Sequence, residues 1–406
     1  MTWRILGFLA LAGLPAFADT AAVLPFWNTS STQPNLDWIG ESIAETIREA
    51  LGSRGALTLE RPDIQDAFRS LGLRERVALS QGSVIKVGES LDAEQVVYGN
   101  FEFTPDPSFT GPGVRGSLKI SARIVDLKRL HLRPEFVESG ALSDLAALQA
   151  HLAWRALTML APNLAPPESE FRSVRTPIRL DAEENYVRGL LARDPVQKEK
   201  FFLQAARLDD RFGNPCYQLG QMYYQRKQYR EAAGWLQKVG EDDIHYREAG
   251  FLLGLADFQS GDFASAQKEF QMIAAVVPLS EVFNDLGAAE NRQNLPRAIA
   301  DFQKAVEGDP NDSVYRFNLG YALWKKGDFA AAAEQFRATL AHAADDQMAT
   351  LLLGRCLKKQ PLETGIHSAD ARLMALERLK TNYEERAYWQ LKAVLDSKSK
   401  PGSGSK

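Results

Sequence analysis

The chain has 406 residues, enough for two or three domains, and its 45% hydrophobic and 25% charged residues are ordinary for a soluble globular protein. The formal net charge is −4, and basic and acidic residues are interleaved, so there is no broad basic field that would favour a nucleic-acid partner.

The N-terminus has the order of a secretory signal. Arg4 is followed by an apolar run over residues 5–14, and Ala16-Phe17-Ala18 then supplies a small-residue cleavage site. We expect a cleaved signal over residues 1–18 and an exported mature chain, located in the bacterial periplasm. An uncleaved N-terminal anchor is the alternative. No other stretch is apolar enough to cross a bilayer, so the mature chain is expected to have no integral membrane segment.

Residues 19–160 mix strand and helix patterns. Apolar or alternating runs predict strands, and spaced apolar residues between caps predict helices. We expect strands at 21–26, 56–60, 96–103, 118–126 and 131–139, and helices at 37–52, 62–71, 83–91 and 142–160. This order predicts one α/β domain with a mixed sheet.

Several short motifs in this domain resemble the CsgG, FlgO and TolB-N-terminal-like domains of bacterial envelope proteins. They are AVLPFWN at 22–28, LDWIGE at 36–41, Glu60-Arg61, Tyr98-Gly99-Asn100 and ARIVD at 122–126. The resemblance implies a module for envelope assembly or interaction that is not an enzyme. The lipidation Cys and pore-forming hairpins of the secretion channels have no counterpart here, which argues against a channel.

Prolines interrupt the pattern after residue 160. Pro162, Pro166 and Pro167 lack backbone N–H groups and fix φ, so residues 161–181 are predicted to be an extended linker.

Five Leu-Gly pairs organise the remainder of the chain. Their glycines are Gly220, Gly254, Gly287, Gly320 and Gly354, separated by 34, 33, 33 and 34 residues. A fixed period in this range is typical of stacked helical hairpins. A plain helical bundle is the alternative, but it would not require such a regular period.

The residues around these pairs resemble the tetratricopeptide repeat. The third repeat is representative, with Leu253, Gly254, Ala266, Phe270 and Pro278 at the family's offsets. We expect an all-α tetratricopeptide superhelical solenoid of five to six repeats over residues 182–395. Its first repeat, 182–212, is weaker, its end over 347–395 is a less regular helical segment, and residues 396–406 are a disordered tail.

In such arrays the first helix of each hairpin lines the concave groove, so the resemblance implies a set of groove residues. They flank the Leu-Gly pairs and are rich in aromatic, amide and basic side chains. The predicted partner-binding residues are Tyr217, Gln221, Tyr224, Phe251, Phe258, Asn284, Asn291, Arg292, Phe317, Tyr321, Trp324, Lys325, Arg355 and Lys358.

This composition predicts a protein or peptide ligand in extended form. Aromatic and Arg side chains are favoured binding anchors, and a ligand carboxylate would lie near Arg292, Lys325, Arg355 or Lys358. The alternative for any single aromatic residue is packing against the next repeat. The full Lys/Asn set of the carboxylate-clamp subclass is absent, so recognition of chaperone tails is not expected.

The sequence contains no recognisable catalytic or metal motif. The five histidines include no His-Glu-x-x-His, and the two cysteines, Cys216 and Cys356, form no Cys-x-x-Cys. These cysteines lie four repeats apart, so we expect two buried thiols and no disulfide. No cofactor and no metal are predicted.

Together these features predict a non-enzymatic exported scaffold that binds protein or peptide partners through the groove. Its predicted address makes envelope components the expected partners. The alternative is an envelope enzyme with an unrecognised active site in the α/β domain.

Overall fold

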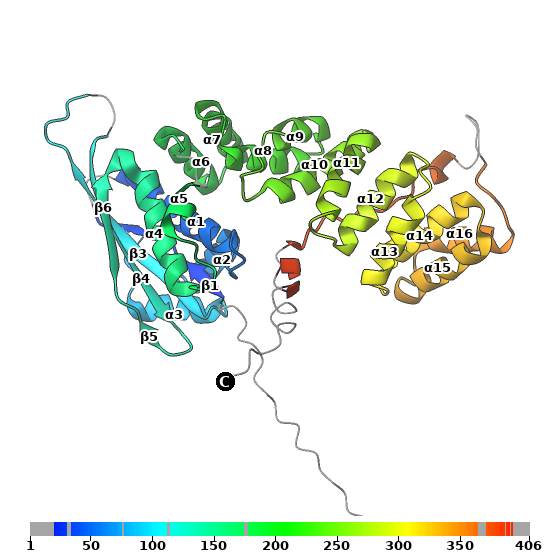
Figure 1. Cartoon of the computed structure of the whole chain (residues 1–406), viewed down its shortest axis with the longest axis horizontal. Helices are drawn as coiled ribbons and strands as arrows, with labels where there is room; N and C mark the ends of the chain where they lie inside the picture. The colour runs from blue at the N-terminus through cyan, green and yellow to red at the C-terminus, as the bar shows by residue number, and fades with distance from the viewer. Residues whose placement is uncertain are drawn as a thin grey trace, which may run out of the picture. The chain divides into compact units, whose positions relative to one another are not determined.

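The computed structural model describes residues 20–30, 34–74, 77–111, 114–173, 178–363, 371–385, 387–389 and 391–392. The chain divides into two compact units, one made of Met1–Phe201 with Lys392–Lys406 and the other of Phe202–Leu391 (Figure 1). The predicted signal, 1–18, and the predicted tail, 396–406, lie outside the described residues.

The first unit is built on a six-stranded mixed sheet, as predicted. Its strands are β1 (Ala21–Val23), β2 (Trp27–Asn28), β3 (Gln95–Pro105), β4 (Gly116–Asp126), β5 (His131–Leu132) and β6 (Phe136–Ala141). Strands β1 and β2 pair in parallel with β3, β4 is antiparallel to β3, and β5 and β6 are antiparallel to β4. The short parallel strands and the long antiparallel pair together produce the predicted mixed topology.

The helices of this unit include the four predicted ones, at nearly the expected positions. They are η1 (Pro34–Leu36), α1 (Trp38–Gly52), α2 (Arg61–Ser70), α3 (Gln81–Ser90), η2 (Leu142–Asp144), α4 (Leu145–Leu160), α5 (Glu168–Ser173) and α6 (Leu180–Leu191). Ile64 and Phe68 of α2 and Val84 of α3 join one buried core with Val96 of β3. Gly40 lets α1 approach the chain after β1, since a Cβ there would lie 1.8 Å from the Phe26 carbonyl oxygen.

Two predictions for this unit are wrong in detail. The strand expected at 56–60 is reduced to one bridge between Thr58 and Ala21, because Glu60 already serves as the N-cap of α2. The linker expected at 161–181 contains α5, which begins directly after Pro166-Pro167. Proline is favourable at the start of a helix, so these residues begin an element instead of continuing an extended chain.

The second unit consists of helical hairpins at the predicted period. Its helices are α8 (Gly213–Gln225), α9 (Tyr229–Leu236), α10 (Tyr246–Ser260), α11 (Phe263–Ala274), α12 (Ser280–Arg292), α13 (Ala298–Gly308), α14 (Ser313–Lys326), α15 (Phe329–His342) and α16 (Gln347–Leu357), and α7 (Pro195–Leu208) spans the boundary between the units. The first helices, α8, α10, α12, α14 and α16, begin 33 or 34 residues apart. The weak first repeat is divided, because α6 packs within the first unit against α1.

Four of the five repeat glycines allow the close approach of the second helix. A Cβ on Gly254 would lie 2.7 Å from the Phe270 ring, and one on Gly287 would lie 2.9 Å from Phe302. Gly354 differs from these four, because a Cβ there would meet nothing within 4 Å. The structure describes no second helix directly after α16 that would contact this position.

The chain after α16 differs most from its prediction. A short turn, η3 (Ala371–Leu373), is followed by an extended segment over residues 375–384, where a less regular helical end was expected. We refer to residues 373–385 as the strap. The strap runs back along the first helices, from α14 past α12 to α10 (Figure 1).

Candidate functional site

The strap is held by side chains of the first helices, on the surface predicted to be the groove. The Asn318 side chain of α14 binds both backbone groups of Arg378: its Oδ1 accepts from the amide at 2.9 Å and its Nδ2 donates to the carbonyl at 2.7 Å. Asn284 of α12 donates to the same carbonyl at 2.9 Å. Both asparagines are fully buried, so their bonds to the strap satisfy polar groups that water does not reach.

Two carboxylates of α12 continue this recognition of the backbone. Oδ1 of Asp285 accepts the amide of Lys380 at 2.9 Å, and Oε1 of Glu281 accepts the amide of Glu384 at 3.1 Å. Burial raises the pKa of Asp285 well above its ordinary value, although hydrogen bonds from the Lys380 amide and Asn284 oppose the shift. The groove therefore binds an extended main chain through a row of amide and carboxylate side chains.

Two basic side chains of the strap reach acidic partners over aromatic rings. Arg378 forms a bidentate ion pair with Asp346, at 2.5 and 3.0 Å, and its guanidinium lies 3.4 Å from the centre of the Phe317 ring. Lys380 lies 2.5 Å from Asp312 and 5.0 Å from the centre of the Tyr315 ring. Hydrogen bonds from Arg378 hold the pKa of Asp346 below its ordinary value.

The strap also carries a carboxylate, Glu377, into a basic part of the groove. Its Oε1 accepts from Asn291 at 2.7 Å, and its Oε2 lies 3.7 Å from Arg292. Burial raises the pKa of Glu377, and burial lowers the pKa of Lys325, which interacts electrostatically with Glu377. A carboxylate and two basic groups are thus partly withdrawn from water together.

Aromatic and ionic contacts fix the ends of the strap. Tyr383 stacks on Phe251, with ring centres 4.9 Å apart and an interplanar angle of 15°. Beyond it, Glu385 pairs with Arg247 of α10. At the other end, the hydroxyl of Tyr321 donates to the Leu373 carbonyl at 2.7 Å.

The structure separates the predicted groove residues into two groups. Some contact the strap directly or lie beside Glu377; these are Phe251, Asn284, Asn291, Arg292, Phe317, Tyr321 and Lys325. The others have different surroundings; they are Tyr217, Gln221, Tyr224, Phe258, Trp324, Arg355 and Lys358. Whether either group binds a partner remains a prediction.

Trp324 and Lys358 show how the second group departs from expectation. Trp324 is fully buried, and its indole N–H donates to the Gln360 carbonyl at 2.9 Å, so it packs within the end of the array and is not an open anchor. Lys358 is exposed at the C-cap of α16.

Near α8, Gln221 donates to the Tyr217 hydroxyl at 2.7 Å, and that hydroxyl donates to Glu248 at 3.0 Å. Tyr224 is half-buried against Tyr229, with ring centres 5.5 Å apart. Tyr217 therefore contacts the next repeat, as the packing alternative anticipated, whereas the contact of Tyr224 with Tyr229 lies within one hairpin.

Several polar residues that hydrogen-bond to the strap backbone were not identified from the sequence. Asp285 and Asn318 occupy the same place in their repeats, two residues before the glycine and one residue beyond the predicted row. Their recurrence as polar residues in consecutive hairpins, at a place where Leu252 and Leu352 are apolar, was the available signal. Glu281, Asp312 and Asp346 gave no comparable sign, because acidic residues near helix starts are common as caps.

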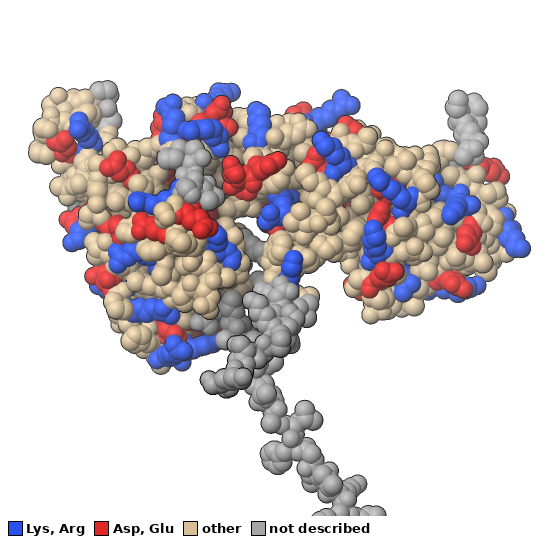
Figure 2. Space-filling model, viewed as in Figure 1, with Lys and Arg blue, Asp and Glu red and all other residues tan. Residues whose placement is uncertain are grey.

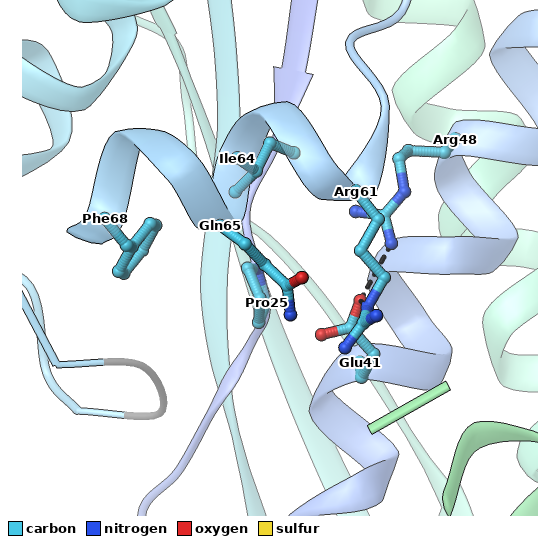
Figure 3. Close-up of a pocket in the computed structure, with 7 residues that line it drawn as sticks. All are labelled: Pro25, Glu41, Arg48, Arg61, Ile64, Gln65 and Phe68. Atoms are coloured by element: carbon cyan, nitrogen blue, oxygen red, sulfur yellow. Dashed lines mark hydrogen bonds and ion pairs between the residues drawn. The ribbon is translucent and has the colours of Figure 1, made fainter. Parts of the chain in front are cut away.

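The first unit contains a small polar pocket lined by Glu41, Arg48 and Arg61 (Figure 3). Glu41 accepts from Arg48 at 2.9 Å and from Arg61 at 3.0 Å, and the opening beside them is about 10 Å³, room for one water. Burial alone would lower the pKa of Arg48, but the carboxylates of Glu45 and Glu41 raise this pKa above its ordinary value. Arg48 also donates to the Val23 carbonyl at 2.9 Å, so this network joins α1, α2 and the sheet.

A second buried cluster joins three helices of this unit. The Ser42 hydroxyl donates to Glu183, and Gln149 donates to Ser42 at 2.7 Å. Ser42 is only 2% exposed, and burial raises the pKa of Glu183. Neither cluster offers a reacting group to a space of substrate size.

Other chemistry is equally sparse in the described ranges. No group of three or more His, Cys, Asp or Glu side chains there could hold a metal ion. Cys216 and Cys356 are free and buried, as predicted, and burial raises the pKa of each thiol to about 11. On the face in view in Figure 2, acidic and basic side chains are interspersed over both units. Within the part of the chain that the structure describes, no helix is both long and apolar enough to cross a bilayer.

The repeats and the groove define the class to which the second unit belongs. Residues 251–313 and 317–362 match the family model described as tetratricopeptide repeat. This region is therefore a tetratricopeptide array, of the kind that acts as a protein-interaction scaffold.

Particular proteins similar to this chain cover only parts of it. Over 55 residues, 14% of this chain, it is 40% identical to bacteriophage adsorption protein A of Escherichia coli K12, and the match spans 6% of that protein's length. Its fold is similar to that of MamA, residue 41 to the end, from Desulfovibrio magneticus RS-1, with 23% identity, 41% of this chain, 95% of that chain and a TM-score of 0.37. It is also similar to YrrB, a tetratricopeptide protein with an unusual peptide-binding site, with 20% identity, 48% of this chain, 91% of that chain and a TM-score of 0.34. These structural likenesses carry no argument about function.

Proposed function

We propose that this chain is a non-enzymatic exported scaffold that binds an extended segment of an envelope protein in the groove of its tetratricopeptide array. The observation that carries the proposal is the row of groove side chains on an extended backbone, in which Asn318, Asn284 and Asp285 bind the main chain of the strap. Main-chain recognition of this kind gives affinity for any extended segment, and flanking pockets give specificity.

The envelope address and the role of the first unit are part of the same proposal. The signal-like order of residues 1–18 and the resemblance of residues 21–160 to CsgG, FlgO and TolB-N-terminal-like domains both support work in the periplasm. In this account the α/β unit docks one envelope component while the array holds another.

Affinity capture from an envelope fraction tests the proposal when a matched pair of variants is used. Arg292→Glu reverses charge where the groove receives a carboxylate, while Lys326→Glu makes the same change at an exposed position of α14. We expect the control to retain the partners of the wild type and Arg292→Glu to lose them. Capture of the same partners by both variants would contradict binding in the groove.

The address has its own test. Cell fractionation of the tagged chain should place the mature form, shortened by the signal, in the periplasm. A full-length chain in the cytoplasm would refute the export proposal and leave the groove proposal standing.

A further inference from the structure

The strap has the properties of a ligand that happens to be covalently attached. It is extended, it forms no hydrogen-bonded ladder with another strand, and its amides at 378, 380 and 384 are bound by groove side chains. A segment that served only to cover the last repeat would need to reach α14 and α16, yet the strap continues past α12 to Phe251 of α10.

The side chains of the strap alternate between two kinds of pocket. In an extended chain, successive side chains point to opposite sides. Arg378 and Lys380 point to one side and meet Asp346 and Asp312. The odd-numbered positions carry Glu377, which meets Asn291 and Arg292, and Tyr383, which stacks on Phe251. The groove therefore binds four side chains of the strap in a fixed order. An acidic residue is followed directly by a basic residue, a second basic residue comes two positions further, and an aromatic residue comes three positions after that.

We propose that the strap is an internal ligand that closes the groove, and that the partner carries an extended segment of the same chemistry, acid-base-x-base-x-x-aromatic, which displaces the strap on binding. This inference rests on the proposed function and names its ligand class. It also assigns direction: the partner segment lies antiparallel to the order of the repeats, as the strap does.

The tether sets how strongly the strap competes. The strap starts within twenty residues of the end of α16, and a covalent tether of this length can hold a ligand at an effective concentration on the order of 1 mM. If the open groove binds the segment with a Kd of about 1 μM, the closed state excludes a free competitor about 1,000-fold. Weakening the strap should therefore increase the affinity for free peptide.

Fluorescence anisotropy with a labelled peptide of residues 371–389 tests this in the full-length chain. The double variant Arg378→Ala/Tyr383→Ala lacks two strap side chains that contact the groove, while the groove residues themselves are unchanged. Arg372→Ala, at an exposed position beside the strap, is the control. We expect the double variant to bind the peptide at least about 50-fold more tightly than the wild type and the control, because its strap no longer fills the groove. A peptide of scrambled sequence should not bind.

Three results would overturn the inference. One is equal peptide affinity in the wild type and the double variant, and another is no binding by the double variant although hydrogen exchange shows its strap released. The third is a strap-exchanged dimer in analytical ultracentrifugation, which would make the segment an intermolecular contact. If the strap peptide fails while envelope capture remains sensitive to Arg292→Glu, this inference is wrong and the proposed function survives. If the peptide binds but envelope capture by the double variant, whose strap no longer competes, does not depend on Arg292, the proposed function fails instead.

Discussion

The substitution Arg378→Ala should open the strap while leaving the array folded. Arg378 contributes a bidentate bond to Asp346, whose side chain is 10% exposed, and a guanidinium packed 3.4 Å from the Phe317 ring centre. A hydrogen bond to a charged group contributes about 1.5–3 kcal/mol, and a cation over an aromatic ring roughly 0.5–2 kcal/mol. Recovered rotamer entropy of the long side chain offsets about 1–2 kcal/mol of this sum. The expected net loss is about 1–3 kcal/mol, roughly a 5- to 150-fold rise in the open population.

Native-state hydrogen exchange measures this opening at individual amides. The amides of Lys380 and Glu384 are bound only by groove carboxylates, so each exchanges when the strap leaves. In Arg378→Ala, both should exchange about 5- to 150-fold faster, while amides within α12 and α14 keep their rates.

The control is Arg372→Ala, which removes an exposed arginine beside the strap and should change neither amide. Unchanged exchange at Lys380 in Arg378→Ala would refute the claim that this side chain closes the groove. Faster exchange throughout α12 and α14 would show instead that the strap is an integral part of the fold.

Three further predictions concern the groove and the array. Asn318→Ala removes the side-chain amide that binds both backbone groups of Arg378, and it leaves buried polar groups unpaired. Urea unfolding of the second unit should therefore show a loss of about 2–4 kcal/mol in the free energy of unfolding. A loss below about 0.5 kcal/mol would contradict the role assigned to Asn318. The pKa of Asp285 is raised in the folded chain, so its contribution to stability is complete below its unfolded pKa and is lost as pH rises through the folded pKa. The melting temperature should therefore decline above about pH 4, and Asp285→Asn should remove the part of this decline that Asp285 causes. An unchanged dependence of melting temperature on pH would refute the argument that burial raises this pKa. Gly254→Ala should destabilise the array by about 1–3 kcal/mol, because the added Cβ clashes with Phe270. Gly354→Ala places its Cβ in open space and should be neutral or stabilising by up to about 1 kcal/mol. Equal shifts in melting temperature for the two variants would contradict this difference in packing.

The periodic part of the fold was predictable because each hairpin repeats the same packing problem. Gly254 and Phe270 hold fixed offsets, and the same pair recurs as Gly287 and Phe302, so the sequence contains several independent copies of one signal. The turn between α10 and α11 follows local rules as well: Gly261 has φ +90°, and Asp262 caps α11 through the Ser265 amide at 3.1 Å.

The strap was not predictable from local patterns, since its conformation depends on partners far away in the sequence. Residues 375–384 contain no proline or glycine that would exclude a helix, and they extend because groove side chains such as Asn318 and Asp285 bind their amides. A long-range contact also explains the surroundings of Trp324. Its place in its helix indicated the groove, but its indole N–H binds the Gln360 carbonyl and the side chain is fully buried.

The residues that contact the strap lie on helices that the sequence pointed to, and some of them lie one position from the predicted row. Asn284 lay in the predicted row, while Asp285, its neighbour, accepts the backbone of Lys380. Spacing alone cannot distinguish two adjacent residues that both border one face of a helix.

The central claim is that one groove receives either the strap or a partner segment of the same chemistry. The most direct measurement is hydrogen exchange of the wild-type chain in complex with a partner obtained by groove-dependent capture. We expect the amides of Lys380 and Glu384 to lose their protection when the partner binds, while α12 and α14 remain protected. A complex in which the partner is bound and both strap amides stay protected would contradict the claim.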